Sequence, residues 1–309
     1  MPPDREDWTN EANDMSKLIV GCGYLGRRVA ACWAEAGHEV FATTRSPGRA
    51  DELRRLGLRP VLADVTRPET LSGLPPAEAV LYAVGFDRAS GASRNEVYAE
   101  GLRAVLDALD PAATRRIIFI SSTGVYGDAD GAWVDEDSPC HPKSEGGRAF
   151  LAGEQLLAQH RLAARSIVLR MAGIYGPDRL PKADDIRAGK PMAVAASGSV
   201  NLIHVDDAAA AVVAAEARAE PPRLYLVSDG HPVQRREFYT HLAEALACRE
   251  PQFVDPPRSE PRTGRGGGDK RVRNERILEE LGVQMKYTTY REGLAAIFRD
   301  AAMRSRKRQ

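Results

Sequence analysis

Three glycines lie close together near the beginning of the chain, in the order Gly21, Gly23 and Gly26. They directly follow an apolar run at 18–20 and open a helical pattern, and this context gives a G-x-G-x-x-G string its meaning. Gly21 permits a tight turn, Gly23 lets the backbone approach a pyrophosphate, and Gly26 allows close packing of helix on strand. With Tyr24 and Leu25 they predict a dinucleotide site at the positive end of a helix. A glycine-rich turn without a ligand is the alternative.

The end of the second strand pattern indicates which dinucleotide the site would take. Residues 39–43 run into Thr44 and Arg45, about 20 residues beyond the glycine turn, where an adenosine ribose would be held. Proteins that select NAD place an acid there, but this chain offers Arg45, has Arg49 nearby, and has no acid before Asp51. A guanidinium suits a 2′-phosphate because its fork of donors meets the phosphate oxygens. The sequence therefore favours NADP over NAD, unless Arg45 is only a solvated surface arginine.

The elements that would position these residues alternate along the chain. The apolar runs lie at 17–20, 38–43, 79–84, 116–121 and 166–170, and the helical patterns at 24–36, 48–56, 94–109 and 147–163. Buried parallel strands joined by helical crossovers produce such a pattern. We expect an α/β fold with a doubly wound parallel sheet, a Rossmann domain over 16–170 that also includes a helix at 205–218.

Beyond residue 170 the alternation weakens. Turn residues crowd 171–200, which shows no clear strands, and we expect 171–204 and 219–309 to build a small mixed substrate lobe. Within it the sequence predicts a strand at 223–228, helices at 233–248, 274–281 and 289–302, and a mobile loop or linker at 255–270. The polar residues 1–15 are expected to be a disordered tail.

The composition excludes several classes of partner. Lys and Arg total 43 and Asp and Glu also total 43, so the overall charge gives no reason to expect nucleic acid or an anionic membrane. No apolar run approaches the roughly 18 residues that span a bilayer, and residues 1–15 are unlike a signal peptide. The four cysteines form no C-x-x-C pair and no metal-like cluster with the six histidines. We expect a cytoplasmic protein without a metal, whose partner is a small molecule.

Five further segments, in order along the chain, resemble the extended short-chain dehydrogenase/reductase family in its epimerase and dehydratase branch. They lie at 64–65, 121–127, 170–177, 203–207 and 225–233. The resemblance implies adenine contacts from Asp64 and Val65, a further cofactor contact from Ala83, and a substrate hydrogen bond from Ser122. It also implies a nicotinamide cofactor, a substrate that could be a sugar nucleotide, and a homodimer through the long helices as an open alternative.

The segment 142–154 departs from that family. The family pattern P-x-S-x-Y-G-x-S-K-x-x-x-E aligns without a gap through Pro142, Ser144, Gly147 and Glu154. Gly146 therefore replaces the catalytic tyrosine and Phe150 the lysine, and Tyr98 stands where an asparagine is expected. Neither replacement can carry the proton that such chemistry moves, and a positioned acid or base contributes about 10² to 10⁴ in rate.

Replacement acids or bases remain as candidates. They are Tyr126, His141, Lys143, Glu145, Arg148, Glu154 and His204, of which Tyr126 joins Ser122 as a catalytic candidate unless it packs under its turn. Two functions stay open. The chain is either an oxidoreductase or epimerase with an altered mechanism, or a non-catalytic sensor or regulatory module that binds NADP(H).

Overall fold

The computed structural model describes residues 16–254 and 268–306. The tail predicted at 1–15 and most of the linker predicted at 255–270 lie outside these residues. Within them, no helix is both long enough and apolar enough to cross a lipid bilayer.

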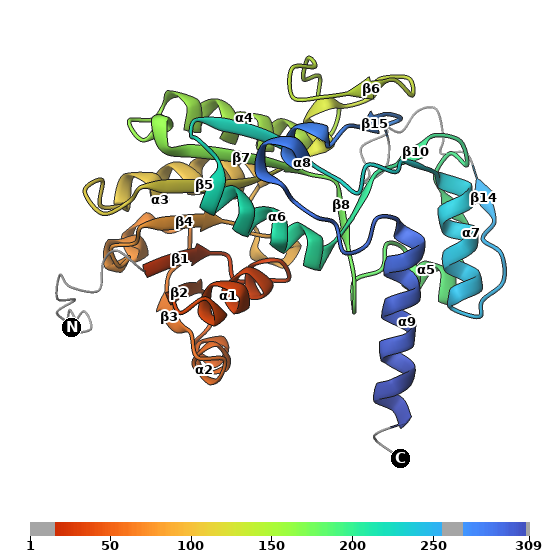
Figure 1. The fold of residues 1–309 in the computed structure, drawn as a ribbon, viewed down its shortest axis with the longest axis horizontal. Coiled ribbons are helices and arrows are strands. Elements are labelled where there is room, and N and C mark those ends of the chain that lie inside the picture. The colour runs from red at the N-terminus through yellow and green to blue at the C-terminus, as the bar shows by residue number, and fades with distance from the viewer. Residues whose placement is uncertain (1–15, 255–267, 307–309) are drawn as a thin grey trace. The chain divides into compact units, whose positions relative to one another are not determined.

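A seven-stranded sheet has the order β12-β7-β5-β4-β1-β2-β3 (Figure 1). Its strands are β1 (Ser16–Val20), β2 (Glu39–Thr44), β3 (Arg59–Leu62), β4 (Ala79–Tyr82), β5 (Arg116–Ser122), β7 (Ser166–Met171) and β12 (Arg223–Val227). β1 pairs in parallel with β2 and β4, and parallel pairing continues from β2 to β3 and from β4 to β5. The chain thus winds in opposite directions from β1, which confirms the doubly wound Rossmann fold. Ligands collect at the carboxyl ends of the strands beside such a reversal.

Helices follow most of these strands. They are α1 (Gly26–Glu35), α2 (Pro47–Arg55), α3 (Gly101–Ala108), α4 (Glu145–Gln159) and α6 (Val205–Arg218), and a π-helical turn, Glu96–Glu100, leads into α3. Leu102 and Leu106 of α3 and Leu157 of α4 share one apolar cluster with Val80 and Ile117 of the sheet. These two helices therefore cover one face of the sheet, and the predicted helix 205–218 is confirmed at the same bounds as α6.

The remaining elements are short. They are β6 (Trp133–Val134), β8 (Gly173–Tyr175), β9 (Met192–Ala193), β10 (Ser199–Val200), β11 (Leu202–His204), β13 (Val233–Gln234), β14 (Phe253–Val254), β15 (Arg271–Val272), α5 (Ala183–Arg187), α7 (Arg235–Ala245), α8 (Glu275–Leu281) and α9 (Tyr290–Arg306). The expectation that 171–200 lacks strands was wrong, since β8, β9 and β10 pair with β11, β14 and β13. Strands of two or three residues are too short to show the alternation on which a sequence prediction depends.

By internal contacts the chain divides into two compact units. Among the described residues, the first comprises 16–121, 149–169 and 209–224, and the second comprises 122–148, 170–208, 225–254 and 268–306. The second unit has an apolar cluster of its own, which includes Tyr175, Leu202, Phe238, Leu242 and Leu294. This grouping differs from the sequence-based limits mainly at 122–148, which join the second unit.

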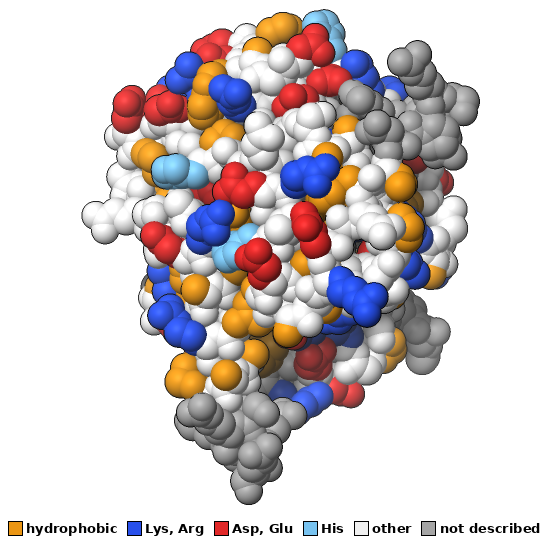
Figure 2. Space-filling view, turned by 90° about the vertical axis from the view of Figure 1, so that its right-hand side faces the viewer, with side chains coloured by type: hydrophobic (Ala, Val, Ile, Leu, Met, Phe, Trp, Pro, Cys, Tyr) orange, Lys and Arg blue, Asp and Glu red, His pale blue; other side chains and the backbone are white. Residues whose placement is uncertain are grey.

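One face of the molecule is drawn in Figure 2. Basic and acidic side chains are interspersed on it, and hydrophobic side chains form only small groups. The charges on this face thus follow the same even balance as the sequence, which has 43 residues of each sign.

Candidate functional site

The three glycines of the turn differ in what surrounds them. A Cβ on Gly21 would lie 2.6 Å from the backbone N and Cα of Val84, and Gly21 has a φ of +91° that favours glycine. A Cβ on Gly26 would lie 2.8 Å from the Gly21 carbonyl oxygen and 3.1 Å from Ile19, so α1 packs directly on β1 there. A Cβ on Gly23 would meet only the Gly21 oxygen, at 4.0 Å. Two glycines are thus required by the fold itself, whereas Gly23 faces open space.

The turn presents backbone donors at the beginning of α1. Leu25 is the N-cap residue, no side chain caps the helix, and its first turn contains no acid. The Thr43 hydroxyl oxygen accepts from the Gly21 N–H at 3.1 Å, which ties the turn to the end of β2. The Arg28 guanidinium lies 4.5 Å from the centre of the Tyr24 ring. An uncapped, positive helix end beside an open glycine fits the pyrophosphate of a dinucleotide.

Arginines lie next to this turn. Arg49 of α2 donates from Nη2 to the Cys22 carbonyl oxygen at 3.1 Å, so its charge lies against the glycine turn. Burial raises the pKa of the Cys22 thiol to about 11, which keeps that thiol protonated. Arg45 Nη2 lies 2.8 Å from Asp87 Oδ2, and both side chains are about half exposed. Asp87 could not be recognised from the sequence, because it is 42 residues from Arg45 in the chain.

The remaining cofactor candidates lie in the same unit. Asp64 Oδ1 accepts from the Thr66 N–H at 3.0 Å and from the Thr66 hydroxyl at 2.8 Å, which fixes the turn after β3. Val65 is buried in the apolar cluster beneath α3. The Ala83 N–H donates to the Val20 carbonyl oxygen at 2.8 Å, so Ala83 extends β4 beside the glycine turn. These residues border the carboxyl ends of β1, β3 and β4, where a bound nucleotide is expected.

Two of the sequence positions that depart from the family lie against each other. The rings of Tyr98 and Phe150 are stacked, with centroids 4.0 Å apart and planes 17° apart. Tyr98 is buried, and Val97 and Ala149 are the other buried members of this apolar cluster. Glu154, one turn further along α4, accepts a hydrogen bond from the Ser121 hydroxyl in the interior of the same unit. Phe150 is thus held by aromatic packing, and Glu154 is a partner within the fold.

The catalytic candidates Ser122 and Tyr126 lie in the second unit. Ser122 caps a short 3-10 helix, Thr123–Tyr126, by accepting from the Gly124 N–H at 3.1 Å. Tyr126 is buried, donates to the Asp135 carbonyl oxygen at 2.6 Å and accepts from Arg170 Nη1 at 2.6 Å. Burial raises the pKa of Tyr126 although Arg170 lowers it. The Tyr126 phenol is buried, makes two hydrogen bonds and has a raised pKa. It is therefore better suited to stabilising its turn than to acting as a base.

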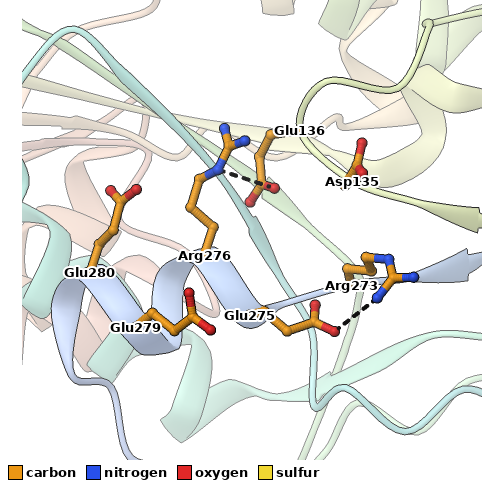
Figure 3. A pocket seen from close by; sticks show the side chains of 7 residues that line it. All are labelled: Asp135, Glu136, Arg273, Glu275, Arg276, Glu279 and Glu280. Carbon is orange, nitrogen blue, oxygen red and sulfur yellow. Dashed lines mark hydrogen bonds and ion pairs between the residues drawn. The ribbon is translucent and has the colours of Figure 1, made fainter.

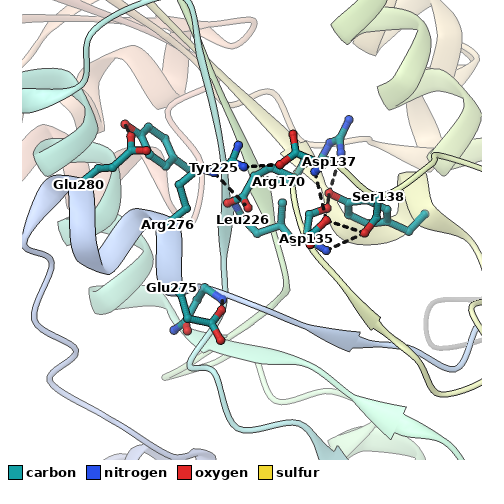
Figure 4. Close-up of polar contacts among 12 residues, drawn as sticks. Asp135, Asp137, Ser138, Arg170, Tyr225, Leu226, Glu275, Arg276 and Glu280 are labelled. Carbon is teal, nitrogen blue, oxygen red and sulfur yellow. Dashed lines mark hydrogen bonds and ion pairs between the residues drawn. The ribbon is translucent and has the colours of Figure 1, made fainter.

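A polar network fixes the loop that follows β6 (Figure 4). Glu136 Oε1 accepts from the Leu226 N–H at 2.9 Å, and Glu136 Oε2 lies 3.5 Å from Arg276 Nε. Arg276 also pairs with Asp137. Glu136 is a buried carboxylate that sequence reasoning missed, because nothing in the spacing of the chain relates it to α8. The network ties β12, α8 and the 135–138 loop together within the second unit.

A surface pocket lies beside this network (Figure 3). It is lined by Asp135, Glu136, Arg273, Glu275, Arg276, Glu279 and Glu280. Two ion pairs, Arg273 with Glu275 and Arg276 with Glu136, already occupy both arginines. Among the described residues, no cluster of three or more His, Cys, Asp or Glu side chains could hold a metal ion. Among the described residues, the pocket therefore supplies no metal site, and both of its arginines already pair with carboxylates.

The second unit contains an unusual carboxyl group after β12. Asp229 is 5% exposed, and burial raises the pKa of its carboxyl to about 7. Its Oδ1 accepts from the His231 N–H at 3.0 Å, whereas its Oδ2 has no hydrogen-bond partner among the described residues. Asp207, whose carboxylate accepts from the Lys286 and Tyr287 N–H groups, adds a second negative charge nearby. The ionised form of Asp229 is therefore disfavoured in the folded protein.

This burial predicts a pH-dependent effect of Asp229→Asn. The folded pKa lies above the ordinary value of 3.8, so the stability that the neutral acid contributes is present below about pH 4 and is lost as pH rises through about 7. Asn stays neutral and keeps an oxygen for the His231 N–H. Relative to the natural protein, the unfolding free energy of the variant should therefore rise by up to about 4 kcal/mol as the pH increases from about 4 to about 8.

Denaturant unfolding at about pH 5 and pH 8 measures this difference. Asp184→Asn, at a position whose side chain is 98% exposed, is the matched control and should show little change between the two conditions. A difference between Asp229→Asn and the natural protein that does not change with pH would contradict the assignment.

Comparison with known proteins agrees with this geometry. The family model for the NAD dependent epimerase/dehydratase family matches residues 18–228. Protein YeeZ from Escherichia coli (strain K12) is 31% identical over 276 residues, which cover 87% of this chain and 95% of YeeZ. A relative from Stigmatella aurantiaca is 28% identical over 241 residues, which cover 74% of this chain and 72% of the relative. It is the 4-hydroxy-2-methyl-3-oxo-4-farnesyl-3,4-dihydroquinoline-1-oxide ketoreductase. A solved structure of a functionally unknown conserved protein from Silicibacter pomeroyi DSS is 31% identical, with a TM-score of 0.74, and the match covers 93% of this chain and 99% of that one. The chain belongs to the NAD dependent epimerase/dehydratase family, an extended branch of the short-chain dehydrogenases/reductases.

Proposed function

We propose that this protein binds the 2′-phosphorylated nicotinamide dinucleotide, NADP(H), at the glycine turn of its first unit, and that it does so without the Tyr-Lys chemistry of its family. The observation that carries the proposal is the contrast among the three glycines. The surrounding fold requires Gly21 and Gly26, but only open space lies beside Gly23, next to the uncapped end of α1. In a strand-to-helix turn at a helix N-terminus, a glycine that packing does not require fits a pyrophosphate that approaches its backbone closely.

The preference for a 2′-phosphate rests on the residues after β2. Arg45 follows Thr44 at the carboxyl end of the strand, and Ser46 caps α2 without a side-chain hydrogen bond. A phosphate there would meet a guanidinium, a hydroxyl and the positive end of α2 together. Unphosphorylated NAD has only a ribose hydroxyl at this position, so it would offer Arg45 no phosphate to pair with.

Substitution of Arg45 tests this preference. We expect Arg45→Ala to weaken NADPH binding by about tenfold or more and to change NADH binding little, because a charge-assisted contact contributes roughly 1.5 to 3 kcal/mol and a surface pair less. Arg54→Ala, which removes an exposed arginine that pairs with Asp51 on the same helix, is the control. Fluorescence titration with both reduced cofactors measures the affinities. Equal NADPH and NADH affinities that Arg45→Ala leaves unchanged would contradict the assignment.

The proposed lack of tyrosine-based chemistry rests on 142–154. In the family, a lysine lowers the pKa of the tyrosine so that the phenol can exchange a proton with the substrate while hydride moves to or from the nicotinamide. Gly146 has no side chain, and the Phe150 ring stacks on Tyr98. The Phe150 ring, which stands at the position of the lysine, has neither a charge nor a proton that it can exchange. These features support a role as a sensor or regulator that responds to NADP(H).

A second candidate is an oxidoreductase or a sugar-nucleotide epimerase with an altered mechanism. The ketoreductase among the relatives favours it, as does the retention of Ser122, whose hydroxyl could bond a substrate oxygen. The hydroxyl alone is too weak a base near neutral pH and would need a partner to accept its proton. For either function we propose a small-molecule ligand, a cytoplasmic location, and the domain limits 16–170 with 205–218 against 171–204 with 219–309. A homodimer remains an alternative to a monomer.

A further inference from the structure

The ion pair between Arg45 and Asp87 crosses the nucleotide-binding edge of the first unit. Arg45 follows the end of β2, and Asp87 lies in the loop after β4, while β1 lies between β2 and β4 in the sheet. The loop begins against the glycine turn, because a Cβ on Gly21 would lie 2.6 Å from Val84. The two side chains meet at 2.8 Å and so bridge the carboxyl end of β1.

Local contacts fix Asp87 in its place. Its Oδ1 accepts from the Ala89 N–H at 2.9 Å and caps the short 3-10 helix Arg88–Ser90. The Ser90 hydroxyl donates to the Asp87 carbonyl oxygen at 2.7 Å. The Ala89 N–H and the Arg45 guanidinium hold the pKa of Asp87 below its usual value, so the group is a carboxylate at neutral pH. Oδ2 is the atom that faces Arg45.

A ligand can replace the Asp87 carboxylate as the partner of Arg45. Both side chains are 48% exposed, and a single Nη2 to Oδ2 contact joins them. An exposed pair of this kind is weak, and a phosphate that carries nearly two negative charges is the stronger partner for a guanidinium. A 2′-phosphate that reached Arg45 would therefore displace the Asp87 carboxylate. The carboxylate would stay close to the phosphate, because its hydrogen bond to the Ala89 N–H keeps it in place.

We propose that Asp87 is a specificity-determining residue of the dinucleotide site, whose carboxylate competes with the cofactor's 2′-phosphate for Arg45. This inference rests on the proposed NADP(H) function. Asp87 lowers the affinity for 2′-phosphorylated dinucleotides and leaves the affinity for unphosphorylated ones unchanged. It thereby reduces the preference that Arg45 creates.

Asp87→Asn tests the competition, because Asn retains the oxygen that caps residues 88–90 and removes only the charge. The probes are NADPH and 2′,5′-ADP, which carry the phosphate, and NADH and 5′-AMP, which do not. We expect Asp87→Asn to bind the first two about three- to tenfold more tightly, with less gain at high salt, and to bind the second two as the natural protein does. In an Arg45→Ala background the gain should fall to less than half.

Asp51→Asn is the matched control, because it removes a negative charge from α2 at a residue that pairs with Arg54 rather than Arg45. It should leave all four affinities unchanged. Weaker or unchanged NADPH binding by Asp87→Asn would overturn the inference, since Asp87 would then orient Arg45 or play no part. An equal gain for NADH would overturn it as well. Failure of the natural protein to bind any of the four probes would instead overturn the proposed function.

Discussion

Gly23→Val protein is expected to fold normally and to lose binding of both NADPH and NADH by more than about a hundredfold. The valine side chain would project into the open space beside the turn, where only the Gly21 oxygen lies within 4.0 Å of its Cβ. The φ of Gly23 lies outside the left-handed region, so valine causes no backbone strain there. The substitution therefore acts on the space that the pyrophosphate would fill and leaves the packing of the protein unchanged.

Thermal unfolding and fluorescence titration of the same sample separate these two effects. Gly73→Val is the matched control, because a Cβ at Gly73 also meets nothing within 4 Å and its φ is likewise ordinary. That control should fold and bind both cofactors as the natural protein does. Wild-type affinity in Gly23→Val would show that no pyrophosphate approaches this glycine.

The second large expected effect is on catalysis. With NADP⁺ or NADPH and a panel of sugar nucleotides, alcohols and ketones, the natural protein should turn over more slowly than about 0.1 per second, because a typical turnover of about 10 per second is reduced by roughly 10² to 10⁴ when the acid or base is missing. The Tyr126 hydroxyl is hydrogen-bonded to the Asp135 carbonyl oxygen and to Arg170, so it does not supply the missing acid or base. Absorbance of the reduced cofactor measures the rate.

Three variants make this result informative. Turnover of a few per second that survives Tyr126→Phe and His204→Ala but is lost in Ser122→Ala would show that Ser122 has a base after all. It would also favour the oxidoreductase over the sensor. Slow turnover that none of the three changes would agree with the proposed sensor.

Much of the fold could be predicted from local and periodic features of the sequence. The strand before Gly21 and the helix after Gly26 depend on neighbours in the chain, and the parallel strands on continuous apolar runs. Helix 205–218 was predicted at its observed bounds because alanines and two first-turn aspartates are strong local signals. The short strands of 171–200 were missed, because two or three residues form a strand only when a distant partner pairs with them.

The site was less predictable than the fold, because its contacts join distant parts of the chain. Arg45 was recognised from its position after a strand, but its partner Asp87 comes from a loop whose path only the folded sheet defines. Glu136 was missed for the same reason, since its partners Leu226 and Arg276 lie 90 or more residues away. The stacking of Tyr98 on Phe150 also needs the close approach of two helical segments.

A nicotinamide dinucleotide bound at the glycine turn of the first unit would protect the backbone amides of that turn. Hydrogen–deuterium exchange of the natural protein with and without saturating NADPH reports both whether the cofactor binds and where it binds. We expect slower exchange in peptides that cover residues 21–27 and 43–50, where the turn donors and Arg45 lie. Unchanged exchange throughout the chain, or protection only in peptides of the second unit, would contradict it.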